Sequence, residues 1–325
     1  MKEKILKCLR EAEDYVSGQE LCQMFDVSRT AIWKVMNQLK EEGYVIDAVK
    51  NKGYRLGQTP DLVTAEEVES LLETSWAARP VVYEEEQAST NQTAKMLAEQ
   101  GASHGTLVVA ERQVSGRGRR GRPWHSPKGS GIWMSILLRP QIHPMSASML
   151  TLVAAMAVYD AISSRVEGCA IKWPNDIVID GRKVCGILTE MSSELDNIHY
   201  VVIGIGINVN TDDFPEDIAS VAASMHVITG AYYKRAEIIA DTWKAFEKYY
   251  DLFVQTENLA LMVDAYNQRL VNMDRRVMIE ERGHRYEGTA RGIDAEGALL
   301  VERDDGTTTS VISGEVSVRG VLGYV

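Results

Sequence analysis

The chain has 325 residues, of which 45% are hydrophobic and 25% charged, and its net charge is −11. This composition is typical of a folded globular protein of two or three domains, and it excludes a disordered regulator, a collagen-like fibre and a small disulfide-stapled scaffold. The four cysteines form no C-x-x-C pair, and no apolar stretch reaches the roughly 18 residues of a membrane span. We therefore expect a cytoplasmic protein with no membrane contact, no signal peptide and no cysteine zinc site.

Positive charge gathers in two short segments of this acidic chain. Residues 28–56 hold six Lys or Arg and three acids, and residues 116–128 hold five Lys or Arg and no acid. The net charge of −11 counts against a protein that coats nucleic acid with its whole surface, because phosphates repel an acidic body. Each basic segment therefore needs its own explanation.

The first 57 residues predict three short helices followed by a β-hairpin. A capping box at residues 17–20 begins the second helix, and Ser28 can cap a third helix over residues 29–42. Two β-like runs, residues 44–49 and 54–56, are joined by a turn that contains Asn and Gly. These elements predict a compact helical unit that ends in a hairpin.

A linker of turn-forming residues, 57–61, separates this unit from a larger part that begins with a second capping box at residues 64–67. Short turns join neighbouring strands up to about residue 270, so a mixed α+β sheet fits better than a doubly wound parallel sheet. The predicted strands are residues 81–83, 106–113, 132–139, 177–179, 183–190 and 200–208. The predicted helices are residues 91–100, 148–166, 234–253 and 258–268.

The last segment, residues 271–325, lacks a helical pattern. It contains short alternating runs between glycines, which predict a small antiparallel β-barrel of SH3-like type. The predicted fold is therefore an α+β multidomain chain. Its expected domains are residues 1–60, 61–270 and 271–325.

The segment Gly116–Trp124 is the sharpest chemical signal in the chain. It satisfies G-x-G-x-x-G after a predicted strand, but the two prolines and the glycine of residues 123–129 prevent the regular helix that a dinucleotide-binding fold requires. The next strand, residues 132–139, also lacks the expected acid. What remains is a glycine-hinged loop with four arginines, which suits a phosphate-containing ligand. The alternative is a solvated basic loop that contacts RNA or a partner.

Four further places carry candidate polar groups, and three of them have a structural alternative. The turn Lys172–Asp176 can aim a carboxylate at an amine or a metal ion. Lys183, at the start of a strand, can bind a carboxylate or a phosphate, although such a lysine is often only solvated. The glycines of Gly204–Asn208 leave room for a flat ligand or for a close contact between strand and helix. Residues Ser89–Asn91 can cap the next helix or clamp the hydrogen-bonding edge of a ligand.

Four segments in this order, Gly116–Trp124, Lys172–Asp176, Lys183–Leu188 and Gly204–Asn208, resemble the motifs of biotin–protein ligases. With the N-terminal unit included, the whole chain resembles the bifunctional bacterial form of this family, which also represses the biotin operon. The resemblance implies that biotin and ATP react with Mg²⁺ to give biotinyl-5′-AMP and pyrophosphate. A lysine of a biotin carboxyl carrier protein domain would then take the biotin. No protein metal site is implied, because phosphates and water hold most of the magnesium.

The same resemblance implies roles for individual residues. Lys183, Arg119 and Asp176 are expected at the reacting centre. The residues that resemble the biotin-binding set are Ser89, Thr90, Asn91, Gln113, Arg117, Gly118, Arg119 and Lys183. The residues that resemble the ATP- and adenylate-binding set are Arg119, Arg122, Trp124, Lys183 and Asn208. Pro123 departs from the common pattern of this loop.

The N-terminal unit resembles a winged helix-turn-helix, which places its third helix in the major groove and its hairpin near phosphates. The expected DNA-contacting residues are Ser28, Arg29, Thr30, Trp33, Lys34, Asn37, Lys50 and Lys52. Because few cations face the repulsion of an acidic body, we expect a homodimer, favoured by the adenylate, on a palindromic operator. The alternative is a structural or protein-binding module.

Other functions fit parts of the pattern. A lipoate or related acyl-acid ligase would use the same chemistry on a similar fold. A ligand-sensing repressor without ligase activity would bind biotin, but it needs no cations aimed at an α-phosphate. An enzyme that uses the arginine loop on RNA conflicts with the net charge of −11.

Overall fold

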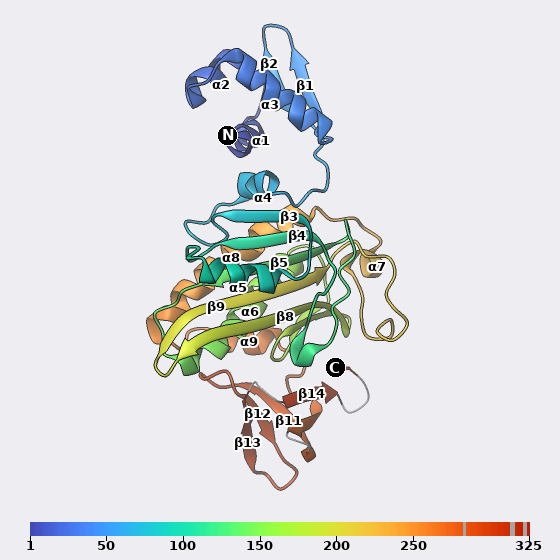
Figure 1. Ribbon diagram of the computed structural model, residues 1–325. Helices are drawn as coiled ribbons and strands as arrows, with labels where there is room; N and C mark the ends of the chain where they lie inside the picture. The colour runs from blue at the N-terminus through green and yellow to red at the C-terminus, as the bar shows by residue number, and fades with distance from the viewer. Residues whose placement is uncertain (282–283, 313–315, 321–323) are drawn as a thin grey trace.

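The computed structural model describes residues 1–281, 284–312, 316–320 and 324–325, which form three units that follow one another along the molecule (Figure 1). A helical N-terminal unit lies at one end, a seven-stranded sheet with its helices lies in the middle, and a five-stranded sheet lies at the other end. The predicted multidomain α+β fold is therefore confirmed, whereas the exact boundaries at residues 60 and 270 stay predictions. The elements of the N-terminal unit are α1 (Lys2–Glu11), α2 (Gly18–Phe25), α3 (Arg29–Glu41), β1 (Ile46–Val49) and β2 (Gly53–Leu56).

Side-chain caps begin the helices of the N-terminal unit where the sequence predicts them. The Ser17 hydroxyl accepts a hydrogen bond from the Glu20 amide, and the Glu20 carboxylate accepts one from the Ser17 amide. The Ser28 hydroxyl accepts a hydrogen bond from the Ala31 amide at the start of α3. β1 and β2 form an antiparallel hairpin, and Asn51 in its turn adopts a φ of 66°. The buried stripe of α3 consists of Ile32, Val35, Met36 and Leu39.

A buried carboxylate joins the N-terminal unit to the central one. Glu67 lies on α4 (Ala65–Leu71) and is 3% exposed. It accepts hydrogen bonds from the Arg10 guanidinium at 2.5 and 2.6 Å and from the Tyr44 hydroxyl at 2.6 Å. The second capping box therefore has only one of its two hydrogen bonds. The Thr64 hydroxyl accepts a hydrogen bond from the Glu67 amide, but the Glu67 carboxylate does not bind the Thr64 amide. The Glu67 carboxylate turns away because a guanidinium binds it more strongly than one backbone amide does.

Arg235 fixes the linker to the central unit. Its guanidinium is almost fully buried and donates hydrogen bonds to the carboxylates of Asp61 at 2.9 Å and Glu111 at 3.0 Å, and to the Gly131 carbonyl at 3.1 Å. The Glu111 carboxylate also accepts a hydrogen bond from the Gly129 amide. The linker, the edge of the sheet and the chain that follows the arginine loop therefore meet at one buried ion cluster.

The central sheet has the strand order β3-β4-β5-β9-β8-β7-β6. β3 and β4 are parallel and every other neighbouring pair is antiparallel, so the predicted mixed sheet is confirmed. The short strand β6 was not predicted, because four residues give too little alternation to recognise. The strands are β3 (Val81–Gln87), β4 (Leu107–Gln113), β5 (Gly131–Leu138), β6 (Cys169–Lys172), β7 (Asp176–Ile179), β8 (Arg182–Glu194) and β9 (Asn197–Asn208).

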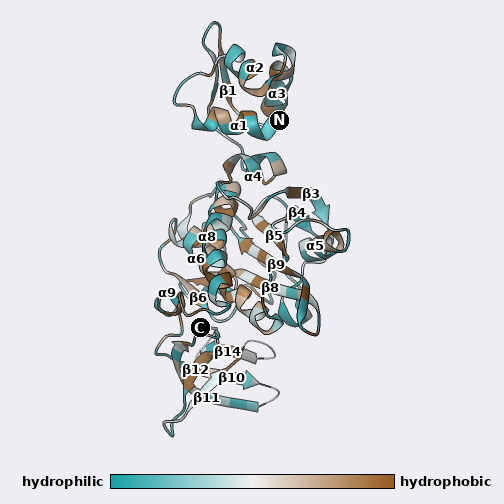
Figure 2. Ribbon diagram, turned by 90° about the vertical axis from the view of Figure 1, so that its left-hand side faces the viewer, coloured by the Kyte–Doolittle hydropathy of each residue, from teal (hydrophilic) through white to brown (hydrophobic). Residues whose placement is uncertain are grey.

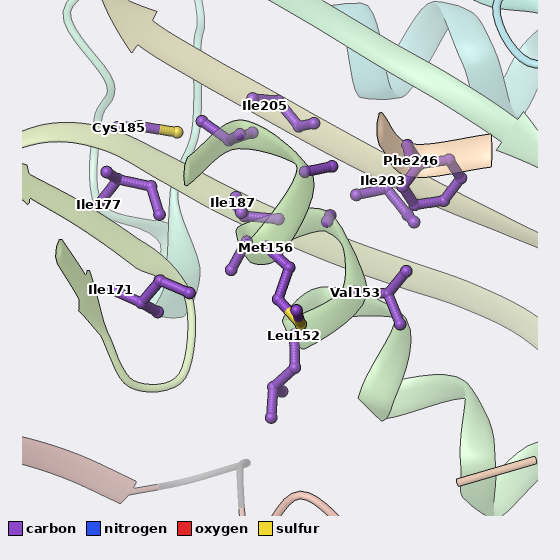
Figure 3. Packing of buried hydrophobic residues seen from close by; sticks show 14 of the residues in the cluster. Leu152, Val153, Met156, Ile171, Ile177, Cys185, Ile187, Ile203, Ile205 and Phe246 are labelled. Carbon is purple, nitrogen blue, oxygen red and sulfur yellow. The ribbon is translucent and has the colours of Figure 1, made fainter. Parts of the chain in front are cut away.

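Helices cover both faces of this sheet, which explains its continuous apolar strands. On one face α5 packs Ala94 and Ala98 against Val108 and Val202. On the other face α6 and α8 contribute to the main core, and Figure 3 shows Val153 of α6 on the side of Ile203 and Phe246, while Met156 lies beside Ile187. Figure 2 shows the hydrophobic residues along the strands of this sheet. The helices of the central unit beyond α4 are α5 (Thr90–Glu99), α6 (Leu150–Ser163), α7 (Met225–Thr229), α8 (Arg235–Thr256) and α9 (Val263–Arg269), with 3₁₀ turns η1 (Arg119–Gly121) and η2 (Pro144–Met149).

One helical segment within the described residues, Pro144–Ser163, is long and apolar enough to cross a membrane by length and composition. Its mean hydropathy is 1.6, and 72% of its apolar window is buried inside the protein. The segment consists of η2 and the core helix α6. Its hydrophobicity is therefore explained by packing between the sheet and α8.

The C-terminal unit is an antiparallel sheet with the strand order β13-β12-β11-β10-β14. In the described parts of this unit β13 and β14 each pair with a single neighbour, so the sheet is open and the predicted closure into an SH3-like barrel is not found. The Trp173 indole donates a hydrogen bond to the Gly297 carbonyl at 3.0 Å and thereby ties the central unit to this sheet. The strands are β10 (Arg276–Glu281), β11 (His284–Ile293), β12 (Leu299–Glu302), β13 (Thr308–Val311) and β14 (Val316–Gly320).

Candidate active site

A cavity of about 360 Å³ is lined both by the central unit and by the C-terminal segment. It brings together the arginine loop, the turn before β7, the strands β8 and β9, and the segment that follows β14. The lining includes all the residues predicted for the reacting centre, biotin and ATP, which are Ser89, Thr90, Asn91, Gln113, Arg117, Gly118, Arg119, Arg122, Trp124, Asp176, Lys183 and Asn208. Residues that are up to 119 positions apart therefore share one cavity, while the role of each stays a prediction.

The arginine loop folds back on itself above the cavity. The Gly118 amide donates to the Arg122 carbonyl at 2.8 Å, and the Trp124 amide donates to the Gly116 carbonyl at 2.8 Å. A strand, β5, follows the loop rather than a helix, as the prolines predict. The Arg119 guanidinium donates to the Asn175 amide oxygen at 2.9 Å, so the loop already contacts the turn before β7.

Asp176 lies at the centre of a cluster of cations and is 8% exposed. Its Oδ1 atom is 2.5 Å from the Lys183 Nζ atom, and its Oδ2 atom accepts a hydrogen bond from the Tyr324 hydroxyl. Burial alone raises the pKa of Asp176, but Lys183 and Lys172 outweigh it, so the pKa lies below its ordinary value. Asp176 therefore stays ionised at neutral pH.

Lys172 is a buried cation that the sequence did not single out, although it begins the predicted turn. It is 6% exposed, and burial lowers its pKa to about 8, against the opposing effect of Asp176. Burial likewise lowers the pKa of Arg119, which nearby Asp176 opposes. The cavity is thus lined by several cationic side chains, an arrangement suited to an anionic ligand.

The opposite part of the cavity is a network of neutral hydrogen-bonding groups. The Thr90 amide donates to the Gln113 side-chain oxygen at 2.8 Å. The Asn91 side-chain nitrogen donates to the Glu190 carboxylate at 2.7 Å, and its oxygen accepts from the Ser135 hydroxyl at 2.6 Å. These bonds fix the orientation of the Asn91 amide and leave an oxygen lone pair for a ligand donor.

The structure tests the structural alternatives for Ser89 and for the strand segment Gly204–Asn208. Ser89 stands at the N-cap position of α5, but its side chain makes no capping bond, so the helix-cap interpretation is wrong for this hydroxyl. A Cβ atom on Gly204 would lie 2.1 Å from the Asn91 oxygen of α5, which is the predicted close contact between strand and helix. A Cβ atom on Gly206 would lie 2.4 Å from the Trp124 indole nitrogen, so this glycine gives a flat aromatic group access to the sheet.

Several lining residues were missed by the sequence reasoning. Phe214 and Ile218 lie in the loop after β9, and Arg319 and Tyr324 lie at or after β14. A lone apolar or aromatic residue in a loop gives no local signal of a ligand site. These residues reach the cavity only through packing between segments that are distant in sequence.

Among the described lining residues of the cavity, cationic side chains outnumber anionic ones. Asp176 is the one carboxylate among the described lining residues. Its two oxygens face Lys183 and Tyr324. Throughout the part of the chain that the structure describes, no group of three or more His, Cys, Asp or Glu side chains could hold a metal ion.

The predicted DNA-contacting residues lie on the N-terminal unit, at the far end of the molecule from the C-terminal sheet (Figure 1). Trp33 on α3 is 57% exposed, which is unusual for so large an apolar side chain. Ser28 is exposed and caps α3, whereas Asn37 is half-buried. The remaining predicted contacts are also exposed, namely Arg29, Thr30, Lys34, Lys50 and Lys52. Helix α3 thus presents a polar face with one exposed indole.

Three family models match the chain. Residues 83–208 match the biotin/lipoate A/B protein ligase family, residues 2–55 match an HTH domain, and residues 273–319 match the biotin protein ligase C-terminal domain. The chain is 42% identical over 299 residues to the bifunctional ligase/repressor BirA of Bacillus spizizenii, which covers 90% of this chain and 91% of that protein. The chain belongs to the bifunctional ligase/repressor family of biotin protein ligases.

The chain is also similar to other biotin protein ligases in sequence and in structure. The bifunctional ligase/repressor BirA of Escherichia coli is 29% identical over 320 residues, which is 97% of this chain and 96% of that protein. Among solved structures, the biotin protein ligase of Aquifex aeolicus in complex with biotin and ATP superposes with a TM-score of 0.65 at 30% identity. That match covers 74% of this chain and 98% of the Aquifex protein.

The lowered pKa of Lys172 predicts a pH-dependent stability. Between pH 8 and 10.5 the unfolded chain binds a proton at Lys172 that the folded chain has lost, so the free energy of unfolding should rise with pH in this window. We expect the free energy of unfolding of the wild type to rise, relative to that of Lys172→Met, by roughly 2–3 kcal/mol between pH 8 and pH 10.5. Thermal denaturation of both proteins at several pH values in this range measures the difference. A difference that is constant from pH 8 to 10.5 would show that the folded state does not perturb Lys172.

Proposed function

We propose that this chain ligates biotin to a carrier protein through a biotinyl-adenylate and also represses transcription of biotin genes. Membership of the ligase/repressor family and the HTH match support the two activities together. The observation that carries the ligase activity is that Arg117, Arg119 and Lys183 line one cavity, in which Lys183 pairs with Asp176. These cations lie where a carboxylate and a phosphate, both anionic, could meet.

The first half-reaction would join biotin to ATP. A biotin carboxylate oxygen attacks the α-phosphorus, the bond from this phosphorus to the oxygen that bridges to the β-phosphate breaks, and pyrophosphate leaves with that electron pair. Negative charge grows on the α-phosphate oxygens as the transition state forms, so fixed cations stabilise it more than the ground state. We assign this role to Lys183 and Arg119, and we assign to Asp176 the task of holding Lys183 in place.

The neutral part of the cavity would bind biotin. Asn91, held by Glu190 and Ser135, offers an oxygen lone pair to a ureido N–H group. Ser89, Thr90 and Gln113 supply further small polar groups beside it. Arg117 and Gly118, which line the same cavity, would close over the bound biotin and its carboxylate.

The adenylate would extend along the loop and the glycine strand. Trp124 and Asn208 line this side and would contact adenine, while Arg122 would face the phosphates. Magnesium bound to the phosphates of ATP would neutralise part of their charge. In this proposal the chain supplies no metal cage of its own, and its cations bind the remaining phosphate oxygens.

The second half-reaction would transfer biotin to a biotin carboxyl carrier protein domain. The ε-amine of a carrier lysine attacks the carbonyl carbon of the mixed anhydride, an amide bond forms, and AMP leaves with the electron pair of the broken C–O bond. The proton that the amine nitrogen loses passes to the solvent. Water would hydrolyse the same anhydride, so closure of the arginine loop protects it. The contact of Arg119 with Asn175 is one bond that stabilises a closed loop.

Repression would rest on the winged N-terminal unit. α3 would enter the major groove with Arg29, Thr30, Trp33, Lys34 and Asn37, while Ser28 caps it and Lys50 and Lys52 approach phosphates from the hairpin. We propose that the adenylate favours a homodimer on a palindromic operator, so adenylate and operator binding are positively coupled. A cytoplasmic location is part of this proposal, and all four cysteines are free thiols.

A second substrate class has one specific support. The matching family model describes both biotin and lipoate ligases, so lipoate or a related acyl acid is the alternative acid. The two acids differ in their rings, and the clamped Asn91 amide suits a ureido group that lipoate lacks.

Isotope exchange between ATP and pyrophosphate tests the ligase activity. We expect exchange with biotin but not with lipoate or octanoate, and we expect Lys183→Ala to lower its rate by roughly 10²–10³-fold while circular dichroism stays that of the wild type. Lys128→Ala, which removes an exposed lysine paired with Glu85, is the control and should retain the wild-type rate. If lipoate but not biotin supports the exchange, the chain is a lipoate ligase instead. If Lys183→Ala is fully active, this lysine does not have the proposed role.

Operator binding tests the repressor activity. We expect DNA from upstream of biotin-synthesis genes to bind at least tenfold more tightly when biotin and ATP are both present, because the adenylate couples to the operator. Lys34→Ala should reduce the dependence of affinity on salt by about one released counterion. Lys7→Ala on α1 is the matched control and should leave that dependence unchanged. Affinity that is indifferent to biotin and ATP would contradict the coupling.

A further inference from the structure

Tyr324, beyond the end of β14, lines the active-site cavity. Tyr324 is the penultimate residue of the chain and lines the cavity together with Val318 and Arg319. Its hydroxyl donates a hydrogen bond to the Oδ2 atom of Asp176, on the opposite side of this carboxylate from Lys183. Burial and the nearby carboxylate raise the pKa of Tyr324, so the hydroxyl keeps the proton that it donates.

The same ring contacts the second buried lysine. The Lys172 Nζ atom lies 3.5 Å from the centroid of the Tyr324 ring, close enough for a strong cation–π interaction. Lys172 is 6% exposed, so the ring face replaces water that the ammonium group has lost. Tyr324 thus uses its hydroxyl for the carboxylate and its ring for the cation.

The hydroxyl has a geometric effect on Lys183. The Asp176 carboxylate accepts a hydrogen bond from Tyr324 at one oxygen and forms an ion pair with Lys183 at the other. It cannot rotate without losing one of these contacts, so Tyr324 fixes the oxygen that faces Lys183. Without this donor, Asp176 could turn its free oxygen toward Lys172, which attracts it electrostatically. Lys183 would then lose the partner that sets its position.

We propose that Tyr324 is a positioning residue for adenylate formation, which orients Lys183 through Asp176 and stabilises Lys172 as a cation. This inference rests on the proposed ligase function, and it assigns to Tyr324 a part in the first half-reaction. Among the described residues, the charged and titratable groups that face Asp176 or Lys172 from the surrounding elements are Arg119, Lys183, Cys185, Arg319 and Tyr324.

Two variants separate the hydroxyl from the ring in the full-length protein. Tyr324→Phe keeps the ring, so we expect the rate of single-turnover adenylate formation from biotin and ATP to fall roughly tenfold per folded molecule. In a plot of this rate against pH, the alkaline limb should stay at its wild-type position. Tyr324→Leu keeps an apolar side chain of smaller size but loses the ring face. We expect the same slowing together with a shift of the alkaline limb to lower pH by about half a unit or more, because Lys172 loses its cation–π partner.

Tyr286→Phe is the matched control within the C-terminal unit. Its hydroxyl has no hydrogen-bond partner among the described residues, so its removal should leave both the rate and the pH profile unchanged. The proposal is contradicted if both Tyr324 variants form the adenylate at the wild-type rate. It is also contradicted if both variants are slower but the alkaline limb of the rate against pH is not displaced in Tyr324→Leu. A wild type without biotin-dependent exchange refutes the ligase function itself, whereas an active wild type with unaltered variants refutes only the role of Tyr324.

Discussion

The charge balance around Asp176 determines what the active site can do. Burying an ion costs several kcal/mol unless it is paired, and here one ionised carboxylate serves Lys183 directly and Lys172 and Arg119 through space. Lys183, Lys172 and Arg119 all line the same cavity, so a carboxylate and a phosphate that bind beside one another would meet cationic groups there. These cations suit the chemistry of adenylate formation, because that reaction creates further negative charge at the same place.

The central and C-terminal units line the site, and the linker of the N-terminal unit is tied to the chain beside it. The turn that carries Asp176 is tied to the C-terminal sheet by the bond from Trp173 to Gly297. The linker of the DNA-binding unit is tied to the chain that follows the arginine loop through Arg235 and Glu111. A ligand that orders the loop therefore acts on elements that also contact the linker. This connection gives a physical route by which adenylate binding could influence DNA binding.

Much of the fold and of the site was readable from local sequence. The capping box at Ser17 and the apolar stripe of α3 act within a few residues, and the four ligase motifs are short and ordered. The features that the sequence did not predict depend on contacts between residues far apart in the chain. Glu67 leaves its predicted cap for Arg10, and Tyr324 reaches Asp176 across 148 positions. The open edge of the C-terminal sheet depends on strand pairing that no single run of residues encodes.

The most direct test is a crystal structure of the full-length protein with a non-hydrolysable analogue of biotinyl-5′-AMP. We predict that the Lys183 Nζ atom and the Arg119 guanidinium both lie about 3 Å from the oxygens of the group that replaces the phosphate. Asp176 should still contact Lys183 from the other side. The account is contradicted if the analogue binds with its phosphate position beyond the reach of both cations.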